Sequence, residues 1–235
     1  SPSIPVDRAQ IVFHFSGVRP LPASDSGYTG NVSRDHQLRP LEPAQSGFAF
    51  PVYSLVGGKW TSFRAFSEET ADVVFKELGY TRKKSTEHIP IGGGADYPQD
   101  DAAQTRWIEK TAGETGVSAA RIRELFDRYG THAAKIAAFI SEGDDALISD
   151  LPDYSKREIQ YLARTEQVTR LIDIPLRRTV IGWLGALTDA ALTDIADACA
   201  AELGWSVERR NEEITRTAQI MNDQYAGRLA VPAVS

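Results

Sequence analysis

The order of apolar and polar residues divides the chain into a β-prone part and a helical part. Up to about residue 58, short runs of β-branched and aromatic residues alternate with glycine and proline, which is typical of strands and turns. From Thr61 onward, apolar residues recur every three or four positions, as on one face of a helix. The pattern predicts an α+β fold: a short β-rich segment ending in a long helix, followed by an all-α C-terminal domain.

Three runs in the first part have the composition of strands. They are Ile11–Phe15, Gly30–Pro40 and Phe48–Gly57. Pro51 inside the last run indicates an edge strand, a bulge or a strand that starts only at Val52. Three strands that end in a single helix make a poor free-standing domain. We therefore expect these strands to close a sheet whose earlier strands belong to another part of a longer protein.

The helical part carries serine or threonine at several predicted helix starts, where a hydroxyl can accept a bond from a free backbone N–H. We divide the chain into residues 1–80, a linker at 81–96, and a helical domain at 97–235. The helices are predicted at Thr61–Leu78, Ala102–Gly113, Ser118–Tyr129, Thr131–Glu142, Ser155–Glu166, Leu176–Leu184, Thr188–Glu202 and Ser206–Asp223.

Composition narrows the class of protein. The 235 residues are 42% hydrophobic and carry a net charge of -6, which argues against a general nucleic-acid binder. One cysteine, Cys199, excludes an internal disulfide and a cysteine-based zinc site, and the four scattered histidines predict no metal site. No apolar run approaches the ~20 residues that span a bilayer, so a cytoplasmic location is expected.

A pair of glycines stands between the last predicted strand and the first long helix. Gly57 and Gly58 are followed by Lys59, Trp60 and Thr61, so a ligand could approach the backbone beside a helix N-terminus and a movable positive charge. The spacing does not match a Walker phosphate loop, because Trp60 follows the lysine. A structural turn and a contact with an anionic or electron-rich ligand both remain open from these residues alone.

A second candidate lies just after the first strand run. Arg19 stands between Gly17 and Pro20, where proline favours an extended backbone and the guanidinium offers a fork of donors for carboxylate or phosphate. A surface arginine in a turn is the equal alternative. The run IPIGGG at Ile89–Gly94 does not have the spacing of a dinucleotide-binding loop.

Other polar groups are interpreted as structural. Arg64 is expected to pair with Glu68 on its own helix, with a contact to a bound ligand as the alternative. His36 is expected to have a structural or outer role. The pair at Arg177 and Arg178 is too small a basic patch for nucleic acid, and we expect it to form ion pairs that tie helices together. The expected partners are Glu158, Glu166 and Asp173.

Several motifs, in order along the chain, resemble the closing part of the FAD-dependent glycerol-3-phosphate dehydrogenases and the related glycerophosphate oxidases. The resemblance covers nearly the whole chain. The motifs are SGVRPL at Ser16–Leu21, SRDH at Ser33–His36, GGKWTSFR at Gly57–Arg64, DRYGTHA at Asp127–Ala133, EIQYLARTE at Glu158–Glu166 and LIDIPLRRT at Leu171–Thr179.

The resemblance implies roles for the candidate residues. It places Gly17 and the run Gly57, Gly58, Lys59, Trp60 and Thr61 against FAD, with the following helix aimed at the N1/O2 edge of the ring. It implies that Arg19 holds glycerol 3-phosphate, that Lys59 supports the developing negative charge, and that hydride passes from C2 of the substrate to the flavin.

The resemblance also implies partners and a limit. A quinone or oxygen would accept the electrons, a homodimer is possible, and peripheral membrane contact through Thr179–Leu187 is the alternative to a buried helix there. The family's N-terminal strand–GxGxxG–helix and its catalytic base have no counterpart in this chain. We therefore expect the chain alone to be inactive and to retain no FAD, and a stand-alone helical interaction module is the alternative function.

Overall fold

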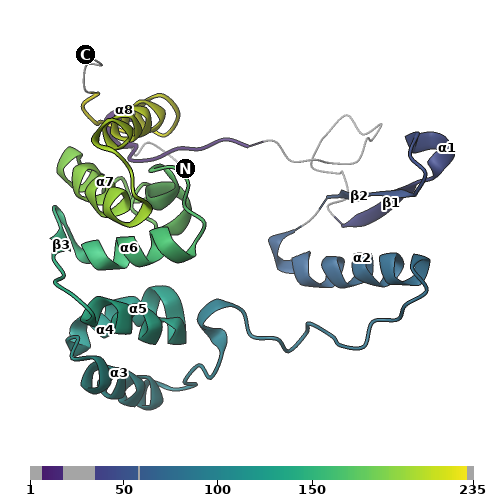
Figure 1. Ribbon diagram of the computed structural model, residues 1–235, viewed down its shortest axis with the longest axis horizontal. Coiled ribbons are helices and arrows are strands. Elements are labelled where there is room, and N and C mark those ends of the chain that lie inside the picture. Colours follow the sequence, from purple (N-terminus) through teal and green to yellow (C-terminus); the bar gives the residue numbers. More distant parts are fainter. Residues whose placement is uncertain (1–6, 18–34, 58, 232–235) are drawn as a thin grey trace, which may run out of the picture. The chain divides into compact units, whose positions relative to one another are not determined.

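The computed structural model describes residues 7–17, 35–57 and 59–231, with only the backbone at Trp60. The chain forms two compact units (Figure 1). The smaller unit is Ser16–Pro90, and the larger one, the helical unit, combines Ser1–Phe15 with Ile91–Ser235. The expected α+β class with a helical C-terminal part is confirmed.

The smaller unit contains an antiparallel hairpin. Strand β1 (Gln37–Leu41) pairs with β2 (Val52–Val56), so that Gln37 lies opposite Val56 and Leu41 opposite Val52. The connection includes a short helix, α1 (Pro43–Ser46), which ends at Gly47 with a φ of 74°. Strand β2 starts immediately after Pro51, which is the delayed start among the three alternatives for this proline, a residue that has no N–H for the strand ladder.

Helix α2 (Phe63–Glu77) follows β2 after a 3-10 turn at Trp60–Ser62. Its one buried residue, Phe66, stacks on the ring of His36 at a centroid distance of 4.5 Å. The His36 ring also lies 2.8 Å from a carboxylate oxygen of Glu69, measured from Nε2. His36 therefore joins the hairpin to α2, which fits the structural role expected for it.

The expected ion pair between Arg64 and Glu68 is wrong. Arg64 donates instead to the backbone carbonyls of Thr86 (2.5 Å) and Glu87 (3.1 Å). Glu68 accepts from the backbone N–H of Thr86 and lies 3.4 Å from Arg82. Hydrogen bonds from Thr86 lower the pKa of Glu68 to about 2. Arg64 and Glu68 therefore both bind the backbone of the segment that follows α2. Hydrogen bonds to these backbone groups stabilise more than an exposed ion pair between two residues of the same helix would.

The helical unit consists mainly of six helices. Figure 1 shows α3, α4 and α5 stacked on one side of α6, with α7 and α8 on the other. The serine or threonine before each of α4, α6, α7 and α8 accepts a bond from the backbone N–H three residues later, which confirms the predicted caps. The helices are α3 (Asp101–Thr115), α4 (Ala119–Tyr129), α5 (Ala133–Ser141), α6 (Lys156–Thr165), α7 (Asp189–Leu203) and α8 (Val207–Gln224).

Two hydrophobic clusters form the core of this unit. One lies among α3, α4 and α5 around Ile122 and Ile136, both fully buried. The other lies among α6, α7 and α8 around Ile159 and Ile195. Tyr129, at the end of α4, packs against both clusters. The end of α4 therefore connects the two halves of the core.

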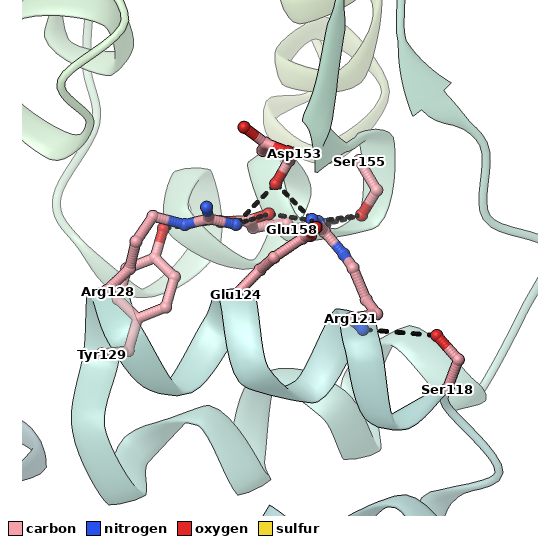
Figure 2. A network of polar contacts seen from close by, with 8 residues as sticks. All are labelled: Ser118, Arg121, Glu124, Arg128, Tyr129, Asp153, Ser155 and Glu158. Atoms are coloured by element: carbon pink, nitrogen blue, oxygen red, sulfur yellow. Dashed lines mark hydrogen bonds and ion pairs between the residues drawn. The ribbon is translucent and has the colours of Figure 1, made fainter.

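A buried carboxylate links α4 to α6 at the same place (Figure 2). Glu158 is 0% exposed and accepts bonds from Arg121, from Arg128 (3.2 Å from both Nε and Nη2) and from the Tyr129 hydroxyl (2.8 Å). Burial raises the pKa of Tyr129, and the charge of Glu158 raises it further. Ser155, which caps α6, also accepts a bond from Arg121 at 3.1 Å. This set of residues is called the Glu158 network below.

The ion pairs expected around Arg177 and Arg178 form only in part. Arg177 lies 2.8 Å from Asp173, as expected. Arg178 donates through Nε to the backbone carbonyl of Glu166 at 2.7 Å, not to its carboxylate. Glu158 binds the arginines of α4 instead, because its position on α6 turns it toward that helix.

The helix predicted at Leu176–Leu184 is wrong. A five-residue π-helix, Ile174–Arg178, is followed by turns, and Trp183 and Leu184 are 45% and 67% exposed. The chain folds back closely here: an added Cβ at Gly182 would lie 3.0 Å from the Pro175 carbonyl oxygen. A helix cannot continue through this reversal, so the apolar run does not form the expected buried helix.

A small hairpin was not predicted. Strands β3 (Leu147–Ile148) and β4 (Leu151–Ser155) pair through a turn at Asp150, whose φ is 62°. Asp194 on α7 accepts bonds from the Ser149 backbone N–H (2.9 Å) and hydroxyl (2.6 Å) and lies 2.7 Å from Lys156. Burial raises the pKa of Asp194, but the bonds from Lys156 and Ser149 outweigh it and lower the pKa to about 2. The hairpin is thus attached to α7 by a charged contact.

The strand predicted at Ile11–Phe15 is also wrong. This segment forms no strand within the described residues and packs on the helical unit. The ring of Phe13 stacks on Trp183 (5.0 Å) and on Tyr225 (5.4 Å). β-propensity reflects a preference for a half-buried surface, and this surface is supplied by aromatic rings in place of a neighbouring strand. The segment therefore groups with the helical unit, in contrast to the predicted division at residue 80.

Candidate functional site

The candidate site is the junction between β2 and α2. Gly57 has a φ of 82°, a conformation that disfavours residues with a Cβ. An added Cβ would also lie 2.9 Å from the backbone oxygen of Asp35. The backbone conformation and the close contact with Asp35 both require glycine at this position, whether or not a ligand binds there. The structural-turn interpretation of Gly57 is therefore sufficient, and the glycine alone does not indicate a ligand.

Lys59 supplies the positive charge at this junction. Its side chain is 54% exposed, and its Nζ lies 3.5 Å from Oδ1 of Asp35. The backbone carbonyl of Lys59 accepts bonds from the N–H (3.1 Å) and the hydroxyl (3.2 Å) of Ser62. Because the Ser62 hydroxyl is turned backwards, it makes no capping bond to α2. Lys59 thus stays accessible to solvent beside the N-terminus of α2, and the side chain of the N-cap residue, Ser62, does not cap this helix.

The start of α2 has the electrostatic character of an anion site. Its first turn has no acidic residue, so no carboxylate of its own neutralises the positive end of the helix. The positive end of the helix and the ammonium of Lys59 together suit the electron-rich N1/O2 edge of a flavin. Thr61 lies in the preceding 3-10 turn and is exposed. The residues present are thus compatible with the cofactor that the sequence motifs implied.

Other predicted site residues are only partly placed. Arg19 and Gly58 lie outside the described residues, and so does the side chain of Trp60. Gly17 is described, and an added Cβ there would meet no atom within 4 Å. The assignments of Arg19 to substrate and of these residues to the cofactor stay predictions.

The helical unit contains a pocket that the sequence did not predict. It is a cavity of about 550 Å³ where the glycine turn Gly92–Gly94 meets the end of α4 and the helix α6. The run IPIGGG was the one feature of the sequence that could have indicated this pocket. Its three glycines do not have the spacing of a dinucleotide-binding loop, so no role was assigned to them. Within the described ranges no group of acidic, histidine and cysteine side chains is arranged to hold a metal ion. The helices of these ranges are also too short or too polar to cross a membrane.

Comparison with known proteins identifies the family. The model of the C-terminal domain of alpha-glycerophosphate oxidase matches residues 84–210. A glycerol-3-phosphate dehydrogenase of Synechocystis is 30% identical over 227 residues, which cover 94% of this chain and 39% of that protein. One from Mycobacterium leprae is 30% identical over 217 residues, covering 89% of this chain and 35% of the relative.

The match extends to eukaryotes. The mitochondrial glycerol-3-phosphate dehydrogenase SDP6 of Arabidopsis thaliana is 27% identical over 236 residues, covering 93% of this chain and 36% of its own length. The chain thus spans well under half the length of these relatives. The family model covers more than half of the chain, including α3 to α7, and the resemblance inferred from the motifs is confirmed. The chain belongs to the family of the C-terminal domain of alpha-glycerophosphate oxidase.

Proposed function

We propose that this chain is the C-terminal part of a flavoenzyme that oxidises sn-glycerol 3-phosphate to dihydroxyacetone phosphate. The observation that carries the proposal is the match to a glycerol-3-phosphate dehydrogenase over 94% of the chain, which includes both units. FAD, when bound, would accept the hydride from C2 of the substrate. A quinone or oxygen would then receive the electrons.

The junction between β2 and α2 would act on the charge of the flavin ring. The N-terminus of α2 and the ammonium of Lys59 would stabilise the negative charge that hydride transfer brings to the ring edge. A helix N-terminus or a nearby cation contributes about 1 kcal/mol in a partly buried site. Arg19 would hold the substrate through a charge-assisted hydrogen bond. A homodimer and a peripheral membrane contact belong to the same proposal.

The alternative function is an interaction module without catalytic activity. The observation that favours it is the helical unit, which has two hydrophobic clusters and buries its own apolar faces. The two functions differ in one simple property. If the chain is an interaction module, neither the chain nor the full-length protein needs to bind flavin. If the chain is part of a flavoenzyme, the full-length protein must bind a flavin that glycerol 3-phosphate reduces.

The test uses the full-length protein encoded by the gene together with the chain described here. We expect the full-length protein to carry flavin, glycerol 3-phosphate to bleach its visible absorbance without oxygen, and the shorter chain to lose added FAD on gel filtration. A full-length protein that holds no flavin, or whose flavin the substrate does not reduce, would refute the flavoenzyme proposal.

A matched pair of variants tests the role of Lys59. Removal of its charge in Lys59→Ala is expected to slow flavin reduction about fivefold and to lower the flavin potential by about 20 mV, which corresponds to about 1 kcal/mol. The control is Lys76→Ala, which removes an exposed lysine from the last turn of the same helix. Equal behaviour of the two variants would remove Lys59 from the site without affecting the family assignment.

A further inference from the structure

The pocket of the helical unit is built from motifs to which the proposed flavin chemistry gives no role. Its volume of about 550 Å³ lies within the range of small-molecule sites. It is lined by the glycine turn of IPIGGG, by the end of α4 with the α5 that follows it, by α6 and by the arginine pair after α6. Four separate stretches of sequence therefore meet around one cavity inside a single unit.

One wall of the pocket is fixed backbone. An added Cβ at Gly93 would lie 1.8 Å from the carbonyl oxygen of Tyr129, and one at Gly130 would lie 2.5 Å from that of Gly93. The hydroxyl of Thr131 donates to the carbonyls of Gly93 (2.9 Å) and Ala95 (2.6 Å). The glycine turn and the end of α4 therefore pack backbone against backbone, with no room for a side chain between them, and this part of the wall is rigid. A preformed wall lowers the entropic cost of binding a ligand.

The other walls are mostly apolar, with an ordered polar pair. Ile136 and Leu162 contribute aliphatic surface, and Tyr129 and Tyr161 contribute aromatic rings. Nε2 of His132 lies 2.8 Å from the hydroxyl of Tyr161, which holds both rings in place. A cavity with this lining favours a ligand that has an aromatic or aliphatic body.

The charges at the pocket differ in how they are neutralised. Arg128 is bound by Glu158, and Arg177 is bound by Asp173. Arg178 uses Nε for a backbone carbonyl, and no carboxylate in the described part of the chain pairs with it. Its two terminal nitrogens are thus the cationic donors available to a ligand.

One negative side chain opposes this charge. Glu166 also lines the pocket, and its backbone carbonyl accepts the Arg178 Nε bond. Its exposed carboxylate makes no ion pair with protein in the described residues. This charge should weaken the binding of an anion and provides a second handle for the test.

We propose that this pocket binds a small organic anion, with a carboxylate or phosphate on Arg178 and an aromatic or aliphatic body against Tyr129 and Tyr161. The pocket shares no residue with the junction of β2 and α2, and the proposal does not depend on the flavin proposal. Arginine recognises both anions through paired N–H donors, so carboxylates and phosphates share this chemistry.

The test titrates the isotope-labelled chain with phenyl phosphate, benzoate, phenol and inorganic phosphate. The readouts are the NMR shifts of the Gly92–Gly94 amides and of the Arg178 Nε–H. We expect saturable shifts with at least one phenyl anion, and binding at least about tenfold weaker for phenol and for inorganic phosphate. The phenyl anion that binds more tightly shows whether the natural group is a phosphate or a carboxylate.

Three variants make the test specific. Arg178→Gln is expected to weaken binding of the phenyl anion about tenfold or more, and Glu166→Gln to strengthen it a few-fold. The control Arg123→Gln removes an exposed arginine from α4 outside the pocket and should leave the affinity unchanged. Circular dichroism confirms that each variant is folded, and Glu166→Gln keeps the test valid should Arg178→Gln unfold.

Three results would overturn the proposal. The first is the absence of saturable shifts with both phenyl anions at millimolar concentration. The second is equal affinity for phenol and for the phenyl anions. The third is unchanged affinity for the phenyl anion in Glu166→Gln, when the affinity of Arg178→Gln is also unchanged or cannot be measured because that variant unfolds.

Discussion

Neutralising Glu158 should destabilise the helical unit more than any surface charge change. Glu158→Gln keeps the shape of the side chain but removes the negative charge that Arg121 and Arg128 share. These two side chains are only 11% and 21% exposed, so water cannot fully replace the lost partner. Removal of one member of a buried ion pair typically costs about 3–5 kcal/mol.

The structure places the expected loss near the lower end of that range. Arg121 keeps a contact with Glu124 at 2.8 Å, and Arg128 keeps a bond to the carbonyl of Asp153 at 2.6 Å. We therefore expect a loss of about 3 kcal/mol in the free energy of unfolding. For a unit of roughly 160 residues this corresponds to a fall of about 6–12 °C in Tm.

Urea unfolding measures this loss. Three of the four tryptophans, Trp107, Trp183 and Trp205, belong to the helical unit, so fluorescence reports mainly on it. The control is Glu114→Gln, which breaks a surface pair with Lys110 at 3.8 Å and should cost about 0.5 kcal/mol or less. A loss below about 1 kcal/mol in Glu158→Gln would show that the Glu158 network contributes little net stability.

Three other perturbations have defined outcomes. Gly93→Ala should lower the stability of the chain by about 2–3 kcal/mol in the same urea assay, because its Cβ would overlap the Tyr129 carbonyl; unchanged stability would contradict the close contact. The pKa of Asp194 is lowered to about 2 in the folded chain, so its contribution is present above pH ~4 and is lost as the pH falls toward 2. In Asp194→Asn, the free energy of unfolding should therefore fall by about 1–2 kcal/mol less between about pH 4 and pH 2 than in the wild type. Equal acid dependence in both proteins would refute the lowered pKa of Asp194. If the full-length protein has the proposed activity, Arg19→Lys should reduce its kcat/KM about tenfold and Arg19→Ala by one to two further factors of ten at normal flavin content, whereas wild-type kinetics in the alanine variant would make the arginine a turn residue.

The features that the sequence predicted correctly depend on short-range contacts. Ser118, Ser155, Thr188 and Ser206 each cap a helix through a bond to a backbone N–H only three residues away. The start of β2 depends on the residue before it, Pro51. Such features need no knowledge of the rest of the fold, so local chemistry was enough to find them.

The features that it missed depend on distant partners. Phe13 finds its aromatic neighbours at Trp183 and Tyr225, and nothing near Phe13 in the chain distinguishes that packing from a strand. The glycines of IPIGGG are explained only by their contact with the end of α4. The sequence predicted that Glu158 pairs with Arg177 and Arg178, but the direction of α6 brings it to Arg121 and Arg128 instead.

The packing of Phe13 has a consequence for synthesis of the chain. The first of the two rings that stack on it, Trp183, leaves the ribosome roughly 170 residues later, which at about 5–20 residues per second is a delay of roughly 10–30 s. During that time the run Ile11–Phe15 is an apolar, β-prone segment without its native contacts, a type of segment that promotes association between nascent chains. Slower translation or a shortage of chaperones should therefore reduce the yield of soluble protein, and a charged residue at the exposed Val12 should restore it.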